Sequence, residues 1–219
     1  MSTAVLSGSS HSNASVGSAV AAVVAVWLAL VFVLGAQEAF ISRPGTPPLP
    51  IFFGFAVPIA LFLIAHGASR RFRDFVLQFD LRLATGVQAW RFAGLGFIAL
   101  YAQHILPGVF AWPAGLGDIA IGLTAPALAL AISRNPAVAG SRTFVVWNLL
   151  GLLDLAVAVS IGTLVASNVI DVHGGASTGI MGELPLLLIP VFLVPLFVML
   201  HLTALFQARR LAAPSRAAR

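Results

Sequence analysis

The 219-residue chain contains no cysteine and no lysine, and only 9% of it is charged. Without cysteine, disulfides, thiolate metal sites and thiol chemistry are excluded. Hydrophobic residues make up 59% of the chain, so a soluble domain of this size could not cover its core with so few charges. We therefore expect a protein whose solvent is a lipid bilayer.

All twelve basic residues are arginine, and the sequence pI is about 11.5. A strongly basic chain can bind nucleic acid, but no nucleic-acid-binding motif accompanies these arginines. Arginines beside apolar runs instead indicate orientation in a membrane and attraction to anionic lipid headgroups. We expect membrane lipids as partners and no nucleic acid.

Apolar runs close to the length of a spanning helix recur along the chain. They predict an all-α, polytopic integral membrane bundle of six transmembrane helices, which forms one domain over residues 18–207. The helices are expected at about 18–35, 51–66, 85–105, 116–132, 143–166 and 184–206. The Ser-rich residues 1–17 predict a disordered N-terminal tail, and residues 208–219 predict a basic cytoplasmic tail.

Residues 68–84, between the second and third predicted helices, differ from the spans in their pattern of apolar and charged residues. Phenylalanines fall on one helical face, and arginines and aspartates fall on the other. This pattern predicts an amphipathic helix that lies in the membrane surface.

The arginines also predict the orientation. Six spans place both termini on one side of the membrane, and that side would carry ten arginines: Arg70, Arg71, Arg73, Arg82, Arg134, Arg142, Arg209, Arg210, Arg216 and Arg219. The other side would carry only Arg43, and Arg91 lies within a span. The positive-inside rule therefore predicts cytoplasmic termini in a multi-pass protein of a bacterial inner (plasma) membrane.

Polar residues within the spans are the candidate site, because a charge at the centre of a spanning helix costs roughly 2.5–3.5 kcal/mol on insertion scales. A rise of about 1.5 Å per residue converts position to depth. An inner layer of four residues is then expected to bind substrate or protons: Arg91, Asn148, Asp154 and His201. Asp154 lies too deep to reach water, so it must be protonated or paired with a neighbour such as Arg91.

A second, outer polar layer is expected near the opposite membrane surface. It consists of Tyr101, Gln103, His104, Asp118 and Glu183. Asp118 and Glu183 fall in the first turns of predicted helices, where carboxylates also cap free backbone N–H groups.

No catalytic motif is present, so whether the chain is an enzyme stays open. Titratable residues inside proline-interrupted helices favour a small-solute or proton-coupled transporter or channel-like protein, with its polar site between the third, fourth, fifth and sixth helices. Two alternatives remain: a membrane-embedded haem- or metal-binding redox or enzyme subunit, and a structural or accessory subunit of a membrane complex. Because six spans make a small transporter, a homo-oligomer or a partner membrane subunit is also expected.

No cofactor and no metal site are predicted from motifs. If the chain binds haem or a metal, its candidate ligands are His66 with His201, or His104 with Asp118.

Overall fold

The structure is a computed structural model, and it describes residues 4–172 and 176–212. Within these residues the fold is helical and contains no strand. Six stretches are long and apolar enough to span a membrane: Val16–Ala36, Leu49–Ala68, Leu81–Ala102, Gly108–Arg134, Arg142–Ala166 and Ile189–Ala212. The predicted all-α class and the number of apolar helices of spanning length are therefore confirmed.

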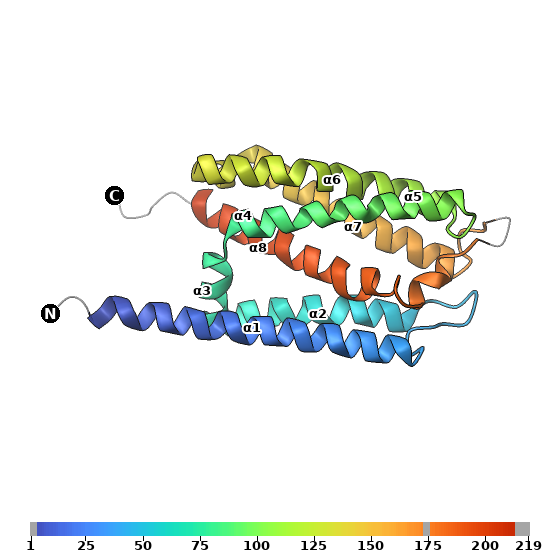
Figure 1. Cartoon of the computed structure of the whole chain (residues 1–219), viewed down its shortest axis with the longest axis horizontal. Helices are drawn as coiled ribbons and strands as arrows, with labels where there is room; N and C mark the ends of the chain where they lie inside the picture. The colour runs from blue at the N-terminus through green and yellow to red at the C-terminus, as the bar shows by residue number, and fades with distance from the viewer. Residues whose placement is uncertain (1–3, 173–175, 213–219) are drawn as a thin grey trace.

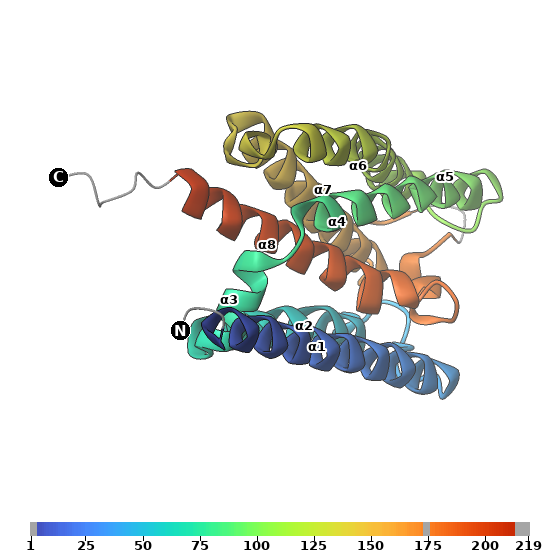
Figure 2. The ribbon, with the colours of Figure 1, turned by 60° about the vertical axis from the view of Figure 1, so that its left-hand side comes forward.

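The helices run side by side as a bundle (Figure 1). In chain order the elements are α1 (Ala4–Ala36), α2 (Leu49–Ala68), α3 (Arg70–Gln78), α4 (Leu81–Gly86), η1 (Val87–Gly94), α5 (Leu95–Ala102), α6 (Gly108–Arg134), η2 (Pro136–Gly140), α7 (Arg142–Ala166), η3 (Thr178–Gly182), η4 (Ile189–Leu193) and α8 (Val194–Ala212). Helix α8 lies between the α1–α2 pair and the group formed by α4 to α7, and it contacts α2, α4 and α7 (Figure 2).

Two of the spanning stretches are not regular α-helices throughout. The third consists of α4, the 3-10 segment η1 and α5, and the sixth begins with the π-helical turn η4, which contains Pro190. Such departures from α-helical hydrogen bonding often mark hinges or functional sites. Both segments border the site described below.

The predicted amphipathic segment is present but shorter than residues 68–84. Helix α3 crosses the ends of the long helices (Figure 1), and the Ser69 hydroxyl caps it by accepting from the Phe72 N–H. Extended backbone at Phe79 ends this helix, and the Asp80 carboxylate then caps α4. Hydrogen bonds from Arg82 lower the pKa of Asp80 to about 2.

Several helix ends differ from the prediction. Helix α1 begins at Ala4, inside the predicted tail 1–17, and α8 continues to Ala212. Helix α6 begins at Gly108, where the prediction began at 116. Pro107 directly precedes this helix, where no helical hydrogen bond needs its N–H. Pro113 lies in the second turn and removes one backbone hydrogen bond, which neighbouring helices allow in membrane proteins. A proline-rich stretch that predicted a turn is therefore largely helical.

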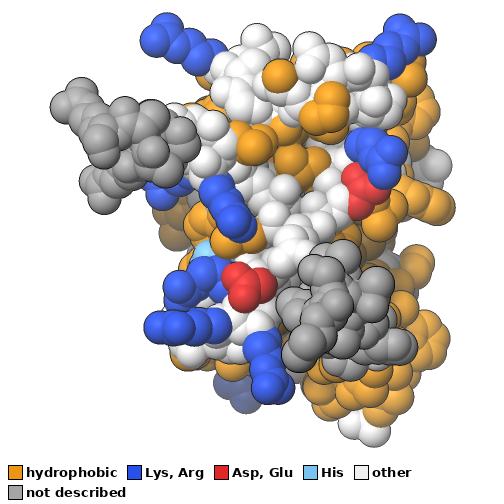
Figure 3. All heavy atoms as spheres, turned by 90° about the vertical axis from the view of Figure 1, so that its left-hand side faces the viewer, with side chains coloured by type: hydrophobic (Ala, Val, Ile, Leu, Met, Phe, Trp, Pro, Cys, Tyr) orange, Lys and Arg blue, Asp and Glu red, His pale blue; other side chains and the backbone are white. Residues whose placement is uncertain are grey.

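The two ends of the bundle differ in charge. Arginines gather where α3 crosses the bundle (Figure 3). We call this the arginine-rich end, and its described arginines are Arg70, Arg71, Arg73, Arg82, Arg134, Arg142, Arg209 and Arg210. The opposite end, here the loop end, holds the connections 37–48 and 103–107 and the described residues 167–172 and 176–188. This separation is the one that the positive-inside argument requires.

Candidate functional site

Arg91 lies at the centre of the polar residues, and its side chain is 0% exposed. Its Nε donates to Asp118 Oδ1 at 2.6 Å, and its Nη2 donates to Asp154 Oδ2. Its Nη1 lies 3.2 Å from His201 Nε2 and 3.3 Å from the carbonyl oxygen of Gly151. These groups come from η1, α6, α7 and α8, so four of the six spanning stretches meet at one guanidinium.

The hydrogen bonds around His201 determine its tautomer. The Asn148 amide donates from Nδ2 to the Phe144 carbonyl at 2.8 Å, so its Oδ1 accepts from His201 Nδ1 at 2.9 Å. Arginine can only donate, so His201 Nε2 must accept from Arg91. These constraints require a neutral imidazole with its proton on Nδ1. We call the set Arg91, Asp118, Asn148, Asp154 and His201 the arginine cluster.

Glycines allow the helices to come close enough for these contacts. A Cβ on Gly94 would overlap Asp118, one on Gly117 would overlap the Asp154 carboxylate, and one on Gly151 would overlap the His201 imidazole. A Cβ on Gly122 would collide with the backbone of Phe92 in η1. Small residues at helix crossings have this role in membrane bundles.

The arginine cluster has an excess of negative charge. It contains one guanidinium and two carboxylates, and its imidazole is neutral, so with both carboxylates ionised its net charge is −1. The carboxylates also keep some exposure, 16% for the Asp118 side chain and 13% for that of Asp154. The cluster can therefore take up a proton or another cation on its carboxylate side.

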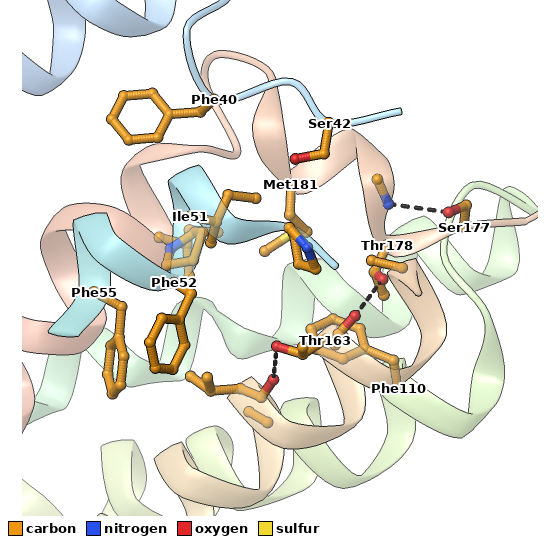
Figure 4. A pocket seen from close by; sticks show the side chains of 18 of the residues that line it. Phe40, Ser42, Ile51, Phe52, Phe55, Phe110, Thr163, Ser177, Thr178 and Met181 are labelled. Atoms are coloured by element: carbon orange, nitrogen blue, oxygen red, sulfur yellow. Dashed lines mark hydrogen bonds between the residues drawn. The ribbon is translucent and has the colours of Figure 1, made fainter. Parts of the chain in front are cut away.

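A cavity of about 500 Å³ begins at Asp118 and extends towards the loop end (Figure 4). Asp118 lines this cavity, whereas Arg91 does not. Its walls come from α2, α5, α6, α7, η4 and the loops. They include five phenylalanines: Phe40, Phe52, Phe55, Phe97 and Phe110. Polar groups stand at the far end, where Arg43 and Glu183 are exposed and form its mouth.

Two buried polar residues that the sequence analysis missed lie on the other side of Arg91. Gln88 and Thr85 are 1% and 2% exposed, and Gln88 Oε1 and Thr85 Oγ1 have no hydrogen-bond partner among the described residues. Gln88 and Arg91 are three residues apart and share one face of the 3-10 segment η1, and Thr85 at the end of α4 continues this spacing. Together they form a polar line towards the arginine-rich end. The three-residue spacing of polar side chains in an apolar stretch was the available signal.

The structure brings the four residues of the predicted inner layer together, and it places Asp118 with them rather than in the outer layer. The early start of α6 puts Asp118 about 15 Å into the helix by the usual rise, so it lies beside Arg91 and not in a first turn. The other residues of the predicted outer layer do not join it. Tyr101, Gln103 and His104 are exposed at the loop end, and Glu183 precedes the last spanning stretch at the cavity mouth.

Each of the predicted metal or haem ligands has other contacts in the structure. Both ring nitrogens of His201 are engaged within the arginine cluster. His66 stacks on Phe206 with ring centroids 4.4 Å apart, and its backbone carbonyl accepts from Arg73. His104 is exposed in the turn after α5, while Asp118 is bound to Arg91. Across residues 4–172 and 176–212, no three His, Asp or Glu side chains gather in a way that could hold a metal ion.

Comparison with known families shows one match. Residues 48–209 match the model of a family described as a domain of unknown function (DUF8737). The chain belongs to this family. The match runs from the start of α2 into α8, so it includes every residue of the arginine cluster and leaves out α1. No curated protein and no solved structure matches the chain.

Proposed function

We propose that this protein carries a small solute across a bacterial inner membrane in exchange for, or together with, protons. The observation that carries the proposal is the arginine cluster at the closed end of a cavity. Buried carboxylates paired with an arginine inside spanning helices are costly, and in membrane proteins they mark ion, proton and substrate pathways. Here Asp118, whose carboxylate lines the cavity, is also an ion-pair partner of Arg91.

The cavity opens at the loop end of the bundle. Its lining reaches the surface at the loop end, where Arg43, Pro44 and Thr46 are exposed. Towards the arginine-rich end, a tight apolar cluster packs α6, α7 and α8 together: Ile132, Ala139, Phe144, Ala204 and Ala208. A packed core on the side of the arginine-rich end and an open cavity on the side of the loop end are what one state of an alternating-access transporter requires.

The same geometry provides a route for protons. Asp118 and Asp154 share one guanidinium, so a proton on either carboxylate leaves the other paired with Arg91. Gln88 and Thr85 continue the polar line beyond Arg91 and provide unpaired oxygens that water can bridge. The interruptions η1 and η4 lie beside this line and beside the cavity, where a change in helix geometry would open the opposite side.

Orientation belongs to the same proposal. With the arginine-rich end in the cytoplasm, the cavity faces the outside, and the polar line of Thr85 and Gln88 faces the cytoplasm.

The proposal is tested in proteoliposomes that contain a pH-sensitive dye. Solutes of different charge classes are added outside, and lumenal pH is recorded for the wild type, Asp118→Asn, Asp154→Asn and Asp74→Asn. We expect a solute-dependent pH change that both cluster variants lose. Asp74→Asn, an exposed carboxylate on α3, retains it. If no solute class moves protons, or if both cluster variants keep full activity, the proposal is wrong.

A structural or accessory role predicts a different outcome. If the arginine cluster only holds the helices together, Asp154→Asn lowers thermal stability, and no purified form of the protein moves protons or solutes. The matched stability measurement on the same preparations separates the two readings.

A further inference from the structure

We propose that the cavity binds an amphiphilic monocation, with its charged group against Asp118 and its apolar body among the phenylalanines. The inference deepens the proposed function and rests on it only for the statement that the bound ligand is transported. Binding itself follows from the shape and the chemistry of the cavity.

The sign of the ligand charge follows from which member of the ion pair faces the cavity. Arg91 is fully buried behind the carboxylates, whereas Asp118 lines the cavity. The charged and titratable groups that face Asp118 are Arg91 on η1 and Asp154 on α7, and the neutral His201 on α8 lies beyond Arg91. A ligand entering the cavity therefore meets a carboxylate from a cluster that has one carboxylate more than it has cations.

The remaining walls favour a cation with an apolar body. Aromatic ring faces attract cations, and five phenylalanines line this cavity. Among the described residues that line it, Arg43 is the only one with a cationic side chain, and it is exposed at the mouth together with Glu183. A strongly hydrated small ion gains little from such walls, whereas a lipophilic cation gains both apolar burial and cation–π contact.

The size of the cavity and one unpaired hydroxyl also indicate a ligand. A volume of about 500 Å³ lies within the roughly 300–1,000 Å³ of small-molecule sites. The Ser42 hydroxyl lines the cavity, as Figure 4 shows, and its buried oxygen has no partner among the described residues. A ligand with a polar group at its outer end could bind it.

The charge around the cavity mouth is negative, like that of Asp118 at the closed end. The charged residues described at the loop end are Glu38, Asp171 and Glu183 against Arg43 alone. A mouth with an acidic balance raises the local concentration of cations and speeds their entry.

A matched pair of probes tests the inference. Tetraphenylphosphonium and tetraphenylborate have nearly the same shape and opposite charge, so their difference isolates the electrostatic part of binding. Binding of each is measured by equilibrium dialysis against the purified full chain in mild detergent. Detergent without protein corrects for partition into micelles. We expect tetraphenylphosphonium to bind at least about tenfold more tightly than tetraphenylborate, which corresponds to about 1.4 kcal/mol.

Two variants locate the site. Asp118→Asn should weaken tetraphenylphosphonium binding about tenfold or more. Ala158→Phe, which fills the cavity from α7, should abolish it, whereas Ala156→Phe on the exposed face of the same helix should not. The phenylalanine pair keeps the test decisive if Asp118→Asn fails to fold. Equal binding of both probes, or unchanged binding in Asp118→Asn or Ala158→Phe, overturns the inference.

The binding assay and the flux assay test different parts of the two proposals, so each part can be wrong without the other. Selective cation binding without solute-dependent proton movement keeps the ligand class and removes transport. Proton movement with another solute class, but no selective cation binding, keeps transport and removes this ligand class.

Discussion

Asp154 lies directly against Gly117, and its Oδ1 occupies the space that a Cβ at that position would need. The contact joins α6 to α7 beside the guanidinium of Arg91, since Asp154 is also its ion-pair partner. Any side chain at position 117 must therefore displace the carboxylate from Arg91.

Gly117→Ala tests this relationship with a single methyl group. We expect it to remove proton-coupled activity and to lower the free energy of unfolding by about 1–3 kcal/mol, the usual range for overpacking. Gly96→Ala is the control, because a Cβ on Gly96 has nothing within 4 Å. That change should be neutral or raise stability by up to about 1 kcal/mol through helix propensity. Equal behaviour of the two variants in thermal unfolding and in flux would show that the close contact has no role.

The charge balance of the arginine cluster gives a second prediction. Arg91→Gln leaves two carboxylates without their cation, so we expect a loss of about 3–5 kcal/mol, as when one partner of a buried ion pair is removed. The double variant Arg91→Gln/Asp154→Asn leaves one carboxylate, Asp118, which can take a proton. Its loss should be smaller than that of Arg91→Gln alone. The measurement is reversible unfolding in detergent as a double-mutant cycle, and additive losses would contradict the pairing.

Most of this cluster could be predicted from the sequence because polar residues are so rare in the spans. Converting position to depth placed Arg91, Asn148 and His201 at one height with Asp154 above them, and in the structure the four residues are in contact through Arg91 and Asn148. Asp118 falls outside the predicted inner layer because α6 begins eight residues earlier than the sequence predicts. Pro107 precedes the helix and removes no hydrogen bond that it needs, whereas Pro113 removes one in the second turn and the helix continues through it.

Other features lay beyond sequence reasoning for different reasons. The backbone of η1 packs closely against Gly122 of α6, and a local sequence pattern does not predict such a tertiary contact. The cavity depends on how α2 and α7 are held apart, and apolar periodicity does not encode this. The spacing of Thr85 and Gln88 predicts a polar line, but uncharged polar residues are a weaker signal in an apolar stretch than charged ones because burying them costs less.

The imidazole of His201 provides a third prediction, because Asn148 accepts from its Nδ1. Asn148→Leu removes this acceptor and leaves a buried N–H without a partner, which costs about 1–3 kcal/mol. We also expect the wild-type protein, labelled with ¹⁵N-histidine, to show a neutral Nδ1–H tautomer that His201→Gln removes from the spectrum. Gln103→Leu is the control for losing an amide, since Gln103 is exposed at the loop end. If the signal that His201→Gln removes is instead that of an Nε2–H tautomer, the assigned hydrogen bonds are wrong.

The orientation can be tested with unusual clarity because the chain has no cysteine. A single cysteine introduced at Ser133, next to Arg134, reports on the arginine-rich end, and one introduced at Thr46 reports on the loop end. Both positions are exposed and lie outside the packed bundle interior. With the arginine-rich end in the cytoplasm, a membrane-impermeant maleimide added to intact cells should label Thr46→Cys and not Ser133→Cys. After the membrane is permeabilised, both should be labelled, which controls for accessibility of the thiol itself.

The reverse pattern in intact cells would place the cavity mouth in the cytoplasm. The direction of solute movement inferred from the cavity would then be inverted, while the arginine cluster and its predicted chemistry would be unaffected.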